Sequence, residues 1–476
     1  MTETAPSPTS DSLDAAASDW SSRVAPASDA KYDYESLEEE EGAEMIKEDD
    51  VIAVVGPTIL SGMPTDEDDK SPPKIRFTNA LSLADSREKY KYQPDHRPAY
   101  LAPLAEGGSA MAGTPTLYIL ISTLSGTQLA AQFFDDLLYP LLWKIGFKKG
   151  SHTVIWTSTA DSVNKFAKEV LFPNAIRGYL QTVLMLSGDG GTVDVINELC
   201  KSKDGYHGSY VKPTLCLFPL GTGNALYHSI HRPHTLPSVY IQSLRTFLTG
   251  NAVPLSTYRA TFSPGARILS EQGQKNTPLH NNTLYGAVVV SYGFHATLVA
   301  DSDTPEYRKH GDKRFGMAAN ELLNPDEGKS PPHAYKAEVK VSSDGEEMEV
   351  VGDGEHGYVL ASLVSNLERT FTVSPESDKY PNGRLRLVQF GALDAGNVMK
   401  IMGAAYQGGA HIKLDEVLYR EIDKLEVSFK EGGENWKWRR CCIDGTIVGI
   451  EEGGWMKVEI VKPGDEAVDI SIEKSV

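Results

Sequence analysis

Between residues 116 and 230 the sequence alternates between two patterns, and this alternation restricts the fold more than any other feature. Short apolar runs, among them LYILIS and YLQTVLMLS, have the length and composition of buried strands. Each run is followed by a segment with the apolar spacing of a helix, such as ADSVNKFAKEVL and TVDVINELC. Strands that alternate with helices form a parallel sheet with helices on both faces. The sequence therefore predicts a Rossmann-like α/β domain over residues 114–251.

The sequence after residue 252 has a different rhythm. Strand-like segments such as YGAVVVSY, AYKAEVKVS and MKVEIV follow one another with few helical stretches between them. Consecutive strands joined by turns pair in antiparallel fashion. We therefore expect residues 252–476 to form an antiparallel β-sandwich. Before the α/β domain, residues 51–113 read as an extension with short strands and a linker rich in Pro and Gly.

Negative charge is concentrated near the amino terminus. Residues 1–50 carry 15 acidic and 3 basic side chains out of a net charge of −19, and they are rich in Ser, Ala and Pro. Such a composition predicts a disordered acidic tail. The negative balance argues against nucleic-acid binding, and it gives no general attraction to anionic membranes.

Membrane spans and disulfides are not expected from the sequence. No run approaches about 20 apolar residues, and the N-terminus has neither the basic nor the apolar part of a secretory signal. The four cysteines have no CxxC spacing, which favours buried thiols in a reducing compartment. We therefore expect a cytoplasmic protein whose membrane association, if any, is peripheral.

Two glycine-rich turns follow neighbouring strands of the predicted α/β domain. The first is SGDGG over residues 187–191, and the second is GTGN over residues 221–224. The backbone N–H groups of such turns bind phosphate together with the positive end of the following helix. Both turns would open onto the carboxyl ends of the strands, where open parallel sheets bind ligands. Neither turn is a Walker A loop or a GxGxxG turn.

Asp189 stands between the glycines of the first turn, where a carboxylate repels a bare phosphate. It would therefore hold a metal ion, accept a proton or hydrogen-bond the turn itself, and the residues alone leave these alternatives open. In the second turn, Asn224 is a residue type that caps helix N-termini, and Thr222 supplies a hydroxyl group.

The ordered segments SGDG, DVIN and PLGTGNAL resemble the diacylglycerol kinase catalytic-domain family, and their spelling is most similar to its sphingosine kinase branch. The segment YGFHATLVADSDTPEYRKHGDKRFG (292–316) resembles the Gly-Phe and YRxxGxxRF landmarks of that branch. IDGT (443–446) stands where the family has Asp-Gly-Glu. The resemblance covers about residues 116–463, and it implies an α/β nucleotide-binding domain followed by an antiparallel β domain that binds lipid.

The resemblance implies an ATP- and Mg²⁺-dependent lipid kinase. Such an enzyme transfers the γ-phosphate to the primary hydroxyl of a sphingoid long-chain base, presented from a membrane surface. Asp189 would be the general base for that hydroxyl, or it would order the water molecules around Mg²⁺. The sequence identifies neither the metal ligands nor any protein partner.

Further site residues follow from the same resemblance. Asp301 would bind the sphingoid headgroup, with Asp303 as the alternative in register. Arg308 and Arg314 would clamp phosphates, for which the planar guanidinium group is suited. The implied ATP contacts are Ser122, Thr157, Ser187, Gly188, Gly190, Gly191, Gly221, Thr222, Gly223, Asn224, Arg308, Arg314, Asp444, Gly445 and Thr446.

Two departures from the family pattern keep other functions open. The family's first loop holds Asn-Pro and several glycines, whereas residues 122–128 read STLSGTQ, with Gly126 alone. Thr446 replaces a Glu, so a carboxylate is missing near the nucleotide. The alternatives are a diacylglycerol or ceramide kinase, and a catalytically weak lipid- or nucleotide-binding protein of the same fold. For Thr157 an ordinary strand end, and for the two arginines a solvated basic turn, are the competing interpretations.

Overall fold

The chain divides into two compact units in the computed structural model, and each is described by itself. Unit 1 holds Met1–Gly221, Pro233–Pro254 and Ala467–Val476, and unit 2 holds Thr222–Arg232 and Leu255–Glu466. The structure describes residues 48–55, 58–63, 74–78, 91–92 and then 116–473, except 124–125, 127, 148–149, 160, 233–237, 312, 344, 379–382 and 434–435. Most of the predicted acidic tail, and the linker just before residue 116, lie outside the described residues.

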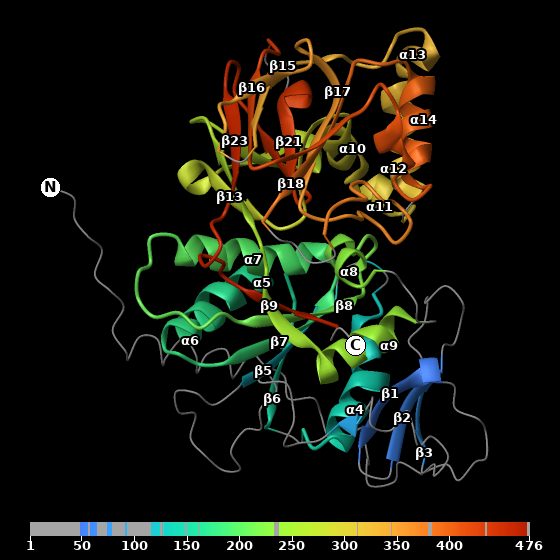
Figure 1. Ribbon diagram of the computed structural model, residues 1–476, viewed down its shortest axis with the longest axis vertical. Helices are drawn as coiled ribbons and strands as arrows, with labels where there is room; N and C mark the ends of the chain where they lie inside the picture. Colours follow the sequence, from blue (N-terminus) through green and yellow to red (C-terminus); the bar gives the residue numbers. More distant parts are fainter. Residues whose placement is uncertain are drawn as a thin grey trace, which may run out of the picture. The chain divides into compact units, whose positions relative to one another are not determined.

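A six-stranded sheet forms the centre of unit 1, and it confirms the predicted parallel architecture (Figure 1). Five strands are parallel and β9 is antiparallel to its neighbour β24. The strands β5, β7 and β8 are buried along nearly their whole length, which explains their nearly continuous apolar sequences, whereas β6 is buried only at Val154 and Ile155. In spatial order the strands are β6 (His152–Trp156), β5 (Thr116–Ile121), β7 (Gln181–Ser187), β8 (Thr214–Pro219), β24 (Asp469–Ile472) and β9 (Asn251–Pro254).

The strand order corrects the Rossmann-like expectation. Numbered along the chain, β5 to β8 lie in the order 2-1-3-4. The Rossmann order begins 3-2-1-4, whereas the flavodoxin-like order begins 2-1-3-4. Apolar periodicity sets which segments become strands but carries no information about which strands become neighbours, so the sequence could not separate the two.

Helices cover both faces of this sheet because the connections on either side of β5 run in opposite directions. On one face, Phe133 packs against Phe218 of β8 and against Tyr240, with ring centroids 5.5 Å and 5.3 Å apart. Two connections contain a π-helical turn directly before a turn that begins with an X-Pro pair, where a proline removes a helical hydrogen bond. The helical elements are α3 (Ala130–Phe133), η6 (Phe134–Leu138), α4 (Tyr139–Lys144), α5 (Ser162–Phe166), η7 (Ala167–Leu171), α6 (Phe172–Ile176), α7 (Asp189–Lys203) and α9 (Val239–Thr249).

The strand β24 comes from the far end of the described chain and completes the sheet of unit 1. It pairs in parallel with β8 and in antiparallel fashion with β9. Ile470 is fully buried, and Lys212 forms an ion pair with Asp469 at 2.7 Å. Unit 1 therefore depends on residues that follow the whole of unit 2 in sequence.

A small second sheet belongs to unit 1 and packs on α9. Its strands lie in the order β3 (Lys74–Thr78), β2 (Thr58–Met63), β1 (Val51–Val55) and β4 (Lys91–Tyr92). The buried guanidinium group of Arg245 in α9 donates hydrogen bonds to the carbonyl oxygens of Val51 and Asp49. The predicted N-terminal extension is thus tied to the helical layer through its backbone.

Unit 2 is built on antiparallel pairs, as predicted, but they form one continuous curled path instead of two separate sheets. The strand β15 makes the link, because its first residues pair with β17 and the following ones with β20. The main path is β12 (Lys275–Pro278), β11 (Arg267–Ser270), β22 (Thr446–Gly449), β21 (Arg440–Ile443), β14 (Val289–Gly293), β17 (Glu355–Ser362), β15 (Tyr335–Ser342), β20 (Lys424–Phe429), β23 (Trp455–Ile460), β10 (Tyr258–Phe262) and β13 (Thr283–Gly286), with β16 (Glu349–Val351), β18 (Leu385–Gly391) and β19 (Leu418–Ile422) attached to it.

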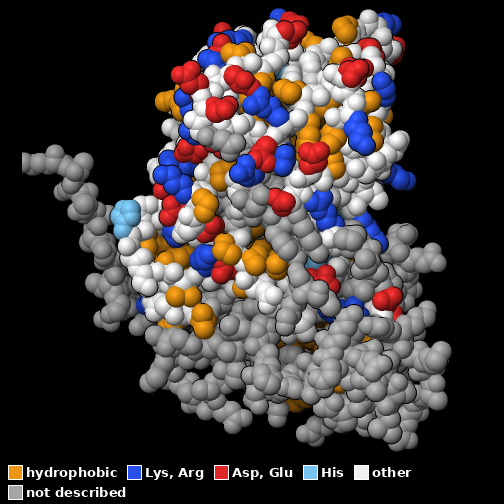
Figure 2. Space-filling view, in the orientation of Figure 1, with side chains coloured by type: hydrophobic (Ala, Val, Ile, Leu, Met, Phe, Trp, Pro, Cys, Tyr) orange, Lys and Arg blue, Asp and Glu red, His pale blue; other side chains and the backbone are white. Residues whose placement is uncertain are grey.

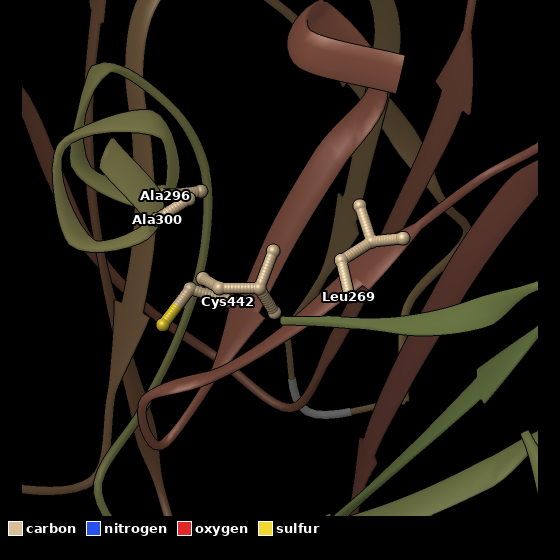
Figure 3. Close-up of a cluster of buried hydrophobic side chains, with 5 residues drawn as sticks. Leu269, Ala296, Ala300 and Cys442 are labelled. Atoms are coloured by element: carbon tan, nitrogen blue, oxygen red, sulfur yellow. The ribbon is translucent and has the colours of Figure 1, made fainter. Parts of the chain in front are cut away.

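The helix α10 packs against β21 and β22 through small side chains. Ala296 and Ala300, one turn apart, contact Cys442 and Leu269 in a buried cluster (Figure 3). On the face that Figure 2 shows, basic and acidic side chains of unit 2 are interspersed. The described helices of unit 2 are α8 (Ala225–Ile230), α10 (Phe294–Ser302), α11 (Pro305–Arg308), α12 (Lys313–Leu323), α13 (Pro325–Gly328) and α14 (Ala395–Ala405), with short 3-10 turns that include η11 (Trp436–Arg439).

A buried carboxylate holds the turn between β21 and β22. Asp444, at φ +46°, accepts hydrogen bonds from the backbone N–H groups of Ala287 (2.6 Å), Val288 (3.1 Å) and Val289 (2.7 Å). The hydroxyl of Tyr258 lies 2.7 Å from the same carboxylate. Burial raises the pKa of Asp444 to about 6, although these hydrogen bonds favour its charged form.

We expect Ile470→Ala to lower the free energy of unfolding by about 3 kcal/mol, because it removes a fully buried side chain from the strand that completes the first sheet. Urea unfolding followed by circular dichroism measures the change. Leu180→Ala is the matched control, since Leu180 is 38% exposed and should cost less than about 1 kcal/mol. Equal losses in the two variants would show that β24 is dispensable for unit 1.

Tyr258→Phe should destabilise unit 2 by about 1 to 3 kcal/mol, since it removes the hydroxyl donor from a buried carboxylate. Tyr406→Phe makes the same chemical change at a side chain that is 53% exposed, and it should leave the unfolding midpoint unchanged. Thermal unfolding of both variants tests this, and an unaltered midpoint for Tyr258→Phe would contradict it.

Candidate functional site

The strand order of unit 1 points to one edge of the sheet. The connections that leave β5 and β7 run in opposite directions, so the two strands flank a topological switch point. In open α/β sheets ligands bind outside the carboxyl ends of the strands at such a point. The predicted residues Ser122, Thr157 and Ser187 all lie at the carboxyl ends of β5, β6 and β7.

The loops that follow β5 and β8 touch each other through glycines. Gly126 has a φ of +52°, and a Cβ built on it would lie 2.6 Å from Cα of Gly221 and 2.8 Å from the carbonyl oxygen of Leu220. A side chain at position 126 would therefore collide with backbone. Because β7 lies between β5 and β8 in the sheet, the two loops meet across the end of β7.

The turn after β7 begins α7, the longest helix among the described residues of unit 1. Gly188 is the extended N-cap residue of α7, and Asp189 is its first helical residue. A carboxylate in the first turn is stabilised by the positive end of the helix dipole. Asp189 is partly exposed, whereas Gly190 is exposed, and a Cβ added to Gly190 would meet no atom within 4 Å. The turn thus presents backbone N–H groups and one carboxylate beside open space.

Ser187 and Gly191 stabilise this turn through a hydrogen bond and a close contact on its buried side. The buried hydroxyl of Ser187 donates to the carbonyl oxygen of Gly188 at 3.1 Å. A Cβ at Gly191 would lie 3.1 Å from the side chain of Ser187, so the glycine leaves room for that hydroxyl. The backbone N–H of Leu220 donates to the carbonyl oxygen of Ser187 at 3.2 Å, which joins the turns after β7 and β8.

Thr157 is buried and holds the loop after β5. The backbone N–H of Thr123 donates to its hydroxyl at 3.2 Å, and the Thr123 hydroxyl donates to its carbonyl oxygen at 2.8 Å. Ser122 begins this loop, and its N–H donates to the carbonyl oxygen of Leu186 at 3.0 Å. These bonds give Thr157 and Ser122 a structural role, and their contact with ATP stays a prediction.

The second glycine-rich turn crosses the boundary between the units in the sequence, since Gly221 belongs to unit 1 and Thr222 to unit 2. Thr222 is exposed, and Asn224 is buried. Asn224 is the N-cap residue of α8, but it adopts the left-handed conformation at φ 55° and its side chain makes no capping hydrogen bond. The predicted N-cap position of Asn224 is therefore confirmed, although its side chain forms no capping hydrogen bond. The ATP contacts of Thr222, Gly223 and Asn224 stay predictions.

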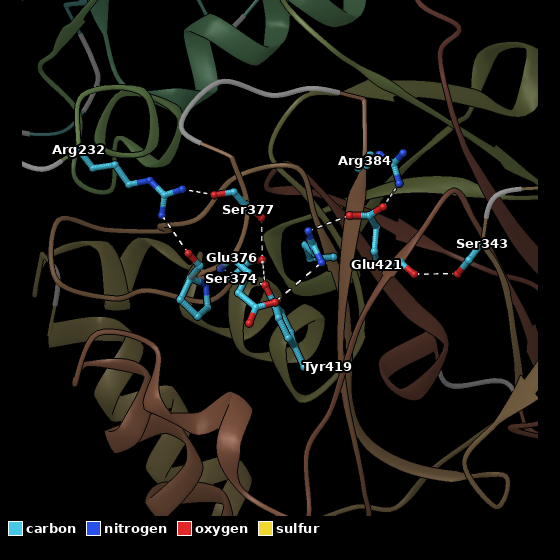
Figure 4. Close-up of polar contacts among 10 residues, drawn as sticks. Arg232, Ser343, Ser374, Glu376, Ser377, Arg384, Tyr419 and Glu421 are labelled. Carbon is cyan, nitrogen blue, oxygen red and sulfur yellow. Dashed lines mark hydrogen bonds and ion pairs between the residues drawn. The ribbon is translucent and has the colours of Figure 1, made fainter.

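Within unit 2, α8 is fastened to the loop before β18. Ser229 donates to the carbonyl oxygen of Asn366 at 3.2 Å, and the N–H of Asn366 donates back to the Ser229 hydroxyl at 3.0 Å. Arg232, just after the helix, donates to the carbonyl oxygens of Pro375 and Ser377 (Figure 4). These contacts fix the short helix that follows the second glycine-rich turn.

Asp301 lies in α10 and already pairs with two cations. Its Oδ1 accepts a hydrogen bond from Nη2 of Arg440 at 2.8 Å, and its Oδ2 lies 3.6 Å from Nζ of Lys437. The Arg440 side chain is only 4% exposed. Sequence analysis missed Arg440, because its partner is far away in the sequence. The signal that was available is a pair of arginines entering an apolar strand, WRRCCI, where one of them must face inward.

The two predicted phosphate-binding arginines differ in what the structure shows. Arg314 lies in α12, with Nη1 3.3 Å from Oδ1 of Asp303 and its guanidinium group over the ring of Phe315 at 4.7 Å. Asp303, the alternative in register for Asp301, is thus an ion-pair partner of Arg314. Arg308 ends α11, and its side chain lies outside the described residues. Phosphate binding by either arginine stays a prediction.

The IDGT segment forms the turn held by Asp444. Its carboxylate is buried and accepts hydrogen bonds from three backbone N–H groups, so the observed role of Asp444 is structural. Gly445 has a φ of +91°, which favours glycine, and Thr446 begins β22. The ATP contacts predicted for this segment are not tested by these features.

Unit 2 also contains a small apolar pocket of about 290 Å³, including the part open to solvent. The enclosed part of this volume is only about 10 Å³, room for about one water molecule, so the pocket is far smaller than a small-molecule site. His333 is one of its few polar walls, and its Nε2 lies 2.8 Å from Oε1 of Glu431. The lining residues are Phe294, Leu322, Leu323, Pro332, His333, Tyr335, Gly357, Leu393 and Val398.

The described residues contain no cluster of three or more His, Cys, Asp or Glu side chains that could hold a metal ion. A helix long and apolar enough to cross a membrane is likewise absent from the described part of the chain.

Comparisons with known proteins identify one matching family model and several similar solved structures. Residues 116–258 match the family model described as the diacylglycerol kinase catalytic domain, and no curated protein matches the sequence. A crystal structure of a diacylglycerol kinase from Bacillus anthracis str. Sterne is 13% identical, with a TM-score of 0.46, covering 75% of this chain and 97% of that chain. A second structure assigned as a diacylglycerol kinase from that organism is 12% identical, with the same TM-score and coverage. Over residues 116–258, which carry both glycine-rich turns, this chain is therefore similar to the diacylglycerol kinase catalytic domain.

Proposed function

We propose that the protein is an ATP-dependent lipid kinase that transfers the γ-phosphate to the primary hydroxyl of a membrane lipid. One observation carries the proposal: the loops after β5 and β8 meet through Gly126 and Gly221 across the end of β7, where Asp189 begins α7. The match of residues 116–258 to the diacylglycerol kinase catalytic domain supports the same reaction.

Backbone N–H groups are the proposed phosphate ligands in unit 1. The first turn of α7 leaves N–H groups without helical partners, and the helix dipole favours negative charge there. Glycines at 188, 190 and 191 allow phosphate oxygens to approach the backbone, and Gly190 faces open space. The residues present therefore fit a nucleoside triphosphate, and bound Mg²⁺ would neutralise part of its negative charge.

Asp189 is the proposed proton acceptor for the lipid hydroxyl. It is partly exposed, so a substrate hydroxyl can reach it, and it lies in the first turn of α7, where the helix dipole favours negative charge. Phosphoryl transfer depends mainly on positioning and charge neutralisation, and a base contributes by removing the hydroxyl proton during transfer. Ordering of the water molecules around Mg²⁺ by the same carboxylate is the alternative role.

The lipid headgroup has two candidates. The sequence favours a sphingoid long-chain base, whose ammonium group would pair with Asp301. A neutral lipid alcohol such as diacylglycerol or ceramide is the second candidate, and a specific contact favours it. Asp301 is already paired with Arg440 and Lys437 within unit 2.

Asp189→Asn should lower kcat for lipid phosphorylation by about 10²- to 10⁴-fold while the protein stays folded, because it removes the proton acceptor. The assay uses radiolabelled ATP with detergent micelles that contain sphinganine, dioleoylglycerol or ceramide. Asp204→Asn is the matched control, since Asp204 is an exposed carboxylate at the other end of the same helix. Wild-type protein that phosphorylates none of these lipids, or full activity in Asp189→Asn, would overturn the proposal.

Gly126→Ala should raise KM for ATP by about tenfold, because its methyl group would push the loop after β5 away from Gly221. Gly150→Ala is the matched control. Gly150 also has a positive φ, at +85°, but a Cβ there has no atom within 4 Å. Backbone strain alone would affect both variants alike, so equal KM values in the two would show that the contact between the loops does not shape the ATP site.

A further inference from the structure

We propose that Arg440 is a built-in counter-charge for Asp301, and that this pair makes the enzyme select neutral lipid alcohols over cationic sphingoid bases. The inference rests on the proposed lipid kinase function and names the class of lipid. It concerns side chains of unit 2 alone.

The position of Arg440 follows from the strand that carries it. Arg440 and Cys442 are two residues apart in β21, so their side chains leave the same face of the strand. Cys442 packs against Ala296 and Ala300 of α10 (Figure 3). Arg440 therefore faces the same helix, and it meets Asp301 one residue after Ala300.

Arg440 is held firmly in this position. Its Nε donates to the carbonyl oxygen of Lys437 at 2.9 Å, and its Nη2 donates to Asp301 at 2.8 Å. With the side chain 4% exposed, the guanidinium group has little access to water. Separating Arg440 from the Asp301 carboxylate would leave a buried positive charge without its partner, which costs several kcal/mol.

Lys437 adds a second positive charge on the other carboxylate oxygen. Its Nζ lies 3.6 Å from Oδ2 of Asp301 and 4.7 Å from the centre of the Trp438 ring. Both oxygens of Asp301 therefore face a cation, and the three side chains together carry a net charge of +1. A third cation would be repelled here instead of attracted.

The helix α10 carries both Asp301 and a lining residue of the apolar pocket of unit 2. Asp301 and Phe294 are seven residues apart on α10 and so project from the same face of the helix, and Phe294 lines the pocket. Tyr335 is another lining residue. Burial raises the pKa of Tyr335, a hydrogen bond with Thr297 opposes this increase, and the charges of Arg440 and Asp301 act on this pKa in opposite directions.

These contacts separate the two lipid classes by charge. A sphingoid ammonium group would have to displace Arg440, which would leave a buried guanidinium group unpaired, or join a region that is already positive. A diacylglycerol or ceramide headgroup is neutral and meets neither cost. Its hydroxyl groups can hydrogen-bond while the ion pair stays intact.

The test compares kcat/KM for sphinganine and for dioleoylglycerol in mixed micelles, using full-length protein. We expect wild type to favour dioleoylglycerol by about tenfold or more, and Arg440→Gln to raise the sphinganine to dioleoylglycerol ratio by about tenfold. Arg440→Lys keeps the positive charge and should keep the wild-type ratio. A role limited to folding would lower both activities together, leave the ratio unchanged and give no rescue by lysine.

Lys457→Gln is the matched control for loss of a positive charge. Lys457 is 51% exposed and pairs with Glu426 in another part of unit 2, so its removal should not move the ratio. A wild-type preference for sphinganine, or an unchanged ratio in folded Arg440→Gln, would overturn the inference.

Failure of the proposed kinase function gives a different result, since wild type would then phosphorylate neither lipid. Sedimentation with vesicles of phosphatidylcholine that contain either sphinganine or dioleoylglycerol then decides the inference without turnover. Stronger binding of Arg440→Gln than of wild type to sphinganine vesicles alone would support it. Equal binding of the two proteins would contradict it.

Discussion

The contact between Gly126 and Gly221 is the constraint on which the edge of the parallel sheet depends. Two loops that leave non-neighbouring strands come together with no side chain between them. They close over the end of β7, and this is where the chain turns into α7 and places Asp189. Only glycine at position 126 allows that approach. The loop after β5 lacks most glycines of the family pattern, but the one that it keeps has a specific structural role.

Much of the fold follows from local patterns. Continuous apolar runs predicted the parallel strands, because these strands are buried on both faces, and alternation of strands in the second half predicted antiparallel pairing. The strand order 2-1-3-4, the insertion of β24 and the single curled path of unit 2 depend on pairing between distant segments. No periodicity records such pairing.

In the candidate site, features formed by neighbouring residues could likewise be predicted from the sequence, whereas contacts between distant residues could not. The glycine-rich turns could be located from the sequence because a turn, its glycines and the helix that follows are adjacent in the chain. The pairing of Asp301 with Arg440 could not, since the partners lie in different elements and only their packing in α10 and β21 brings them together. Asn224 lies at the N-cap of α8 as its residue type predicted, but its backbone is left-handed and its side chain makes no capping hydrogen bond.

The strand β24 has a consequence for how the protein is made. A ribosome finishes the α/β segment and β9 long before it reaches residues 469–472, and until then β8 lacks the neighbour that will cover its open side. During synthesis, the edge of β8 that later pairs with β24 therefore stays unpaired until all of unit 2 has been synthesised. Such an edge can pair with other chains, so protection by a chaperone during synthesis would benefit this architecture.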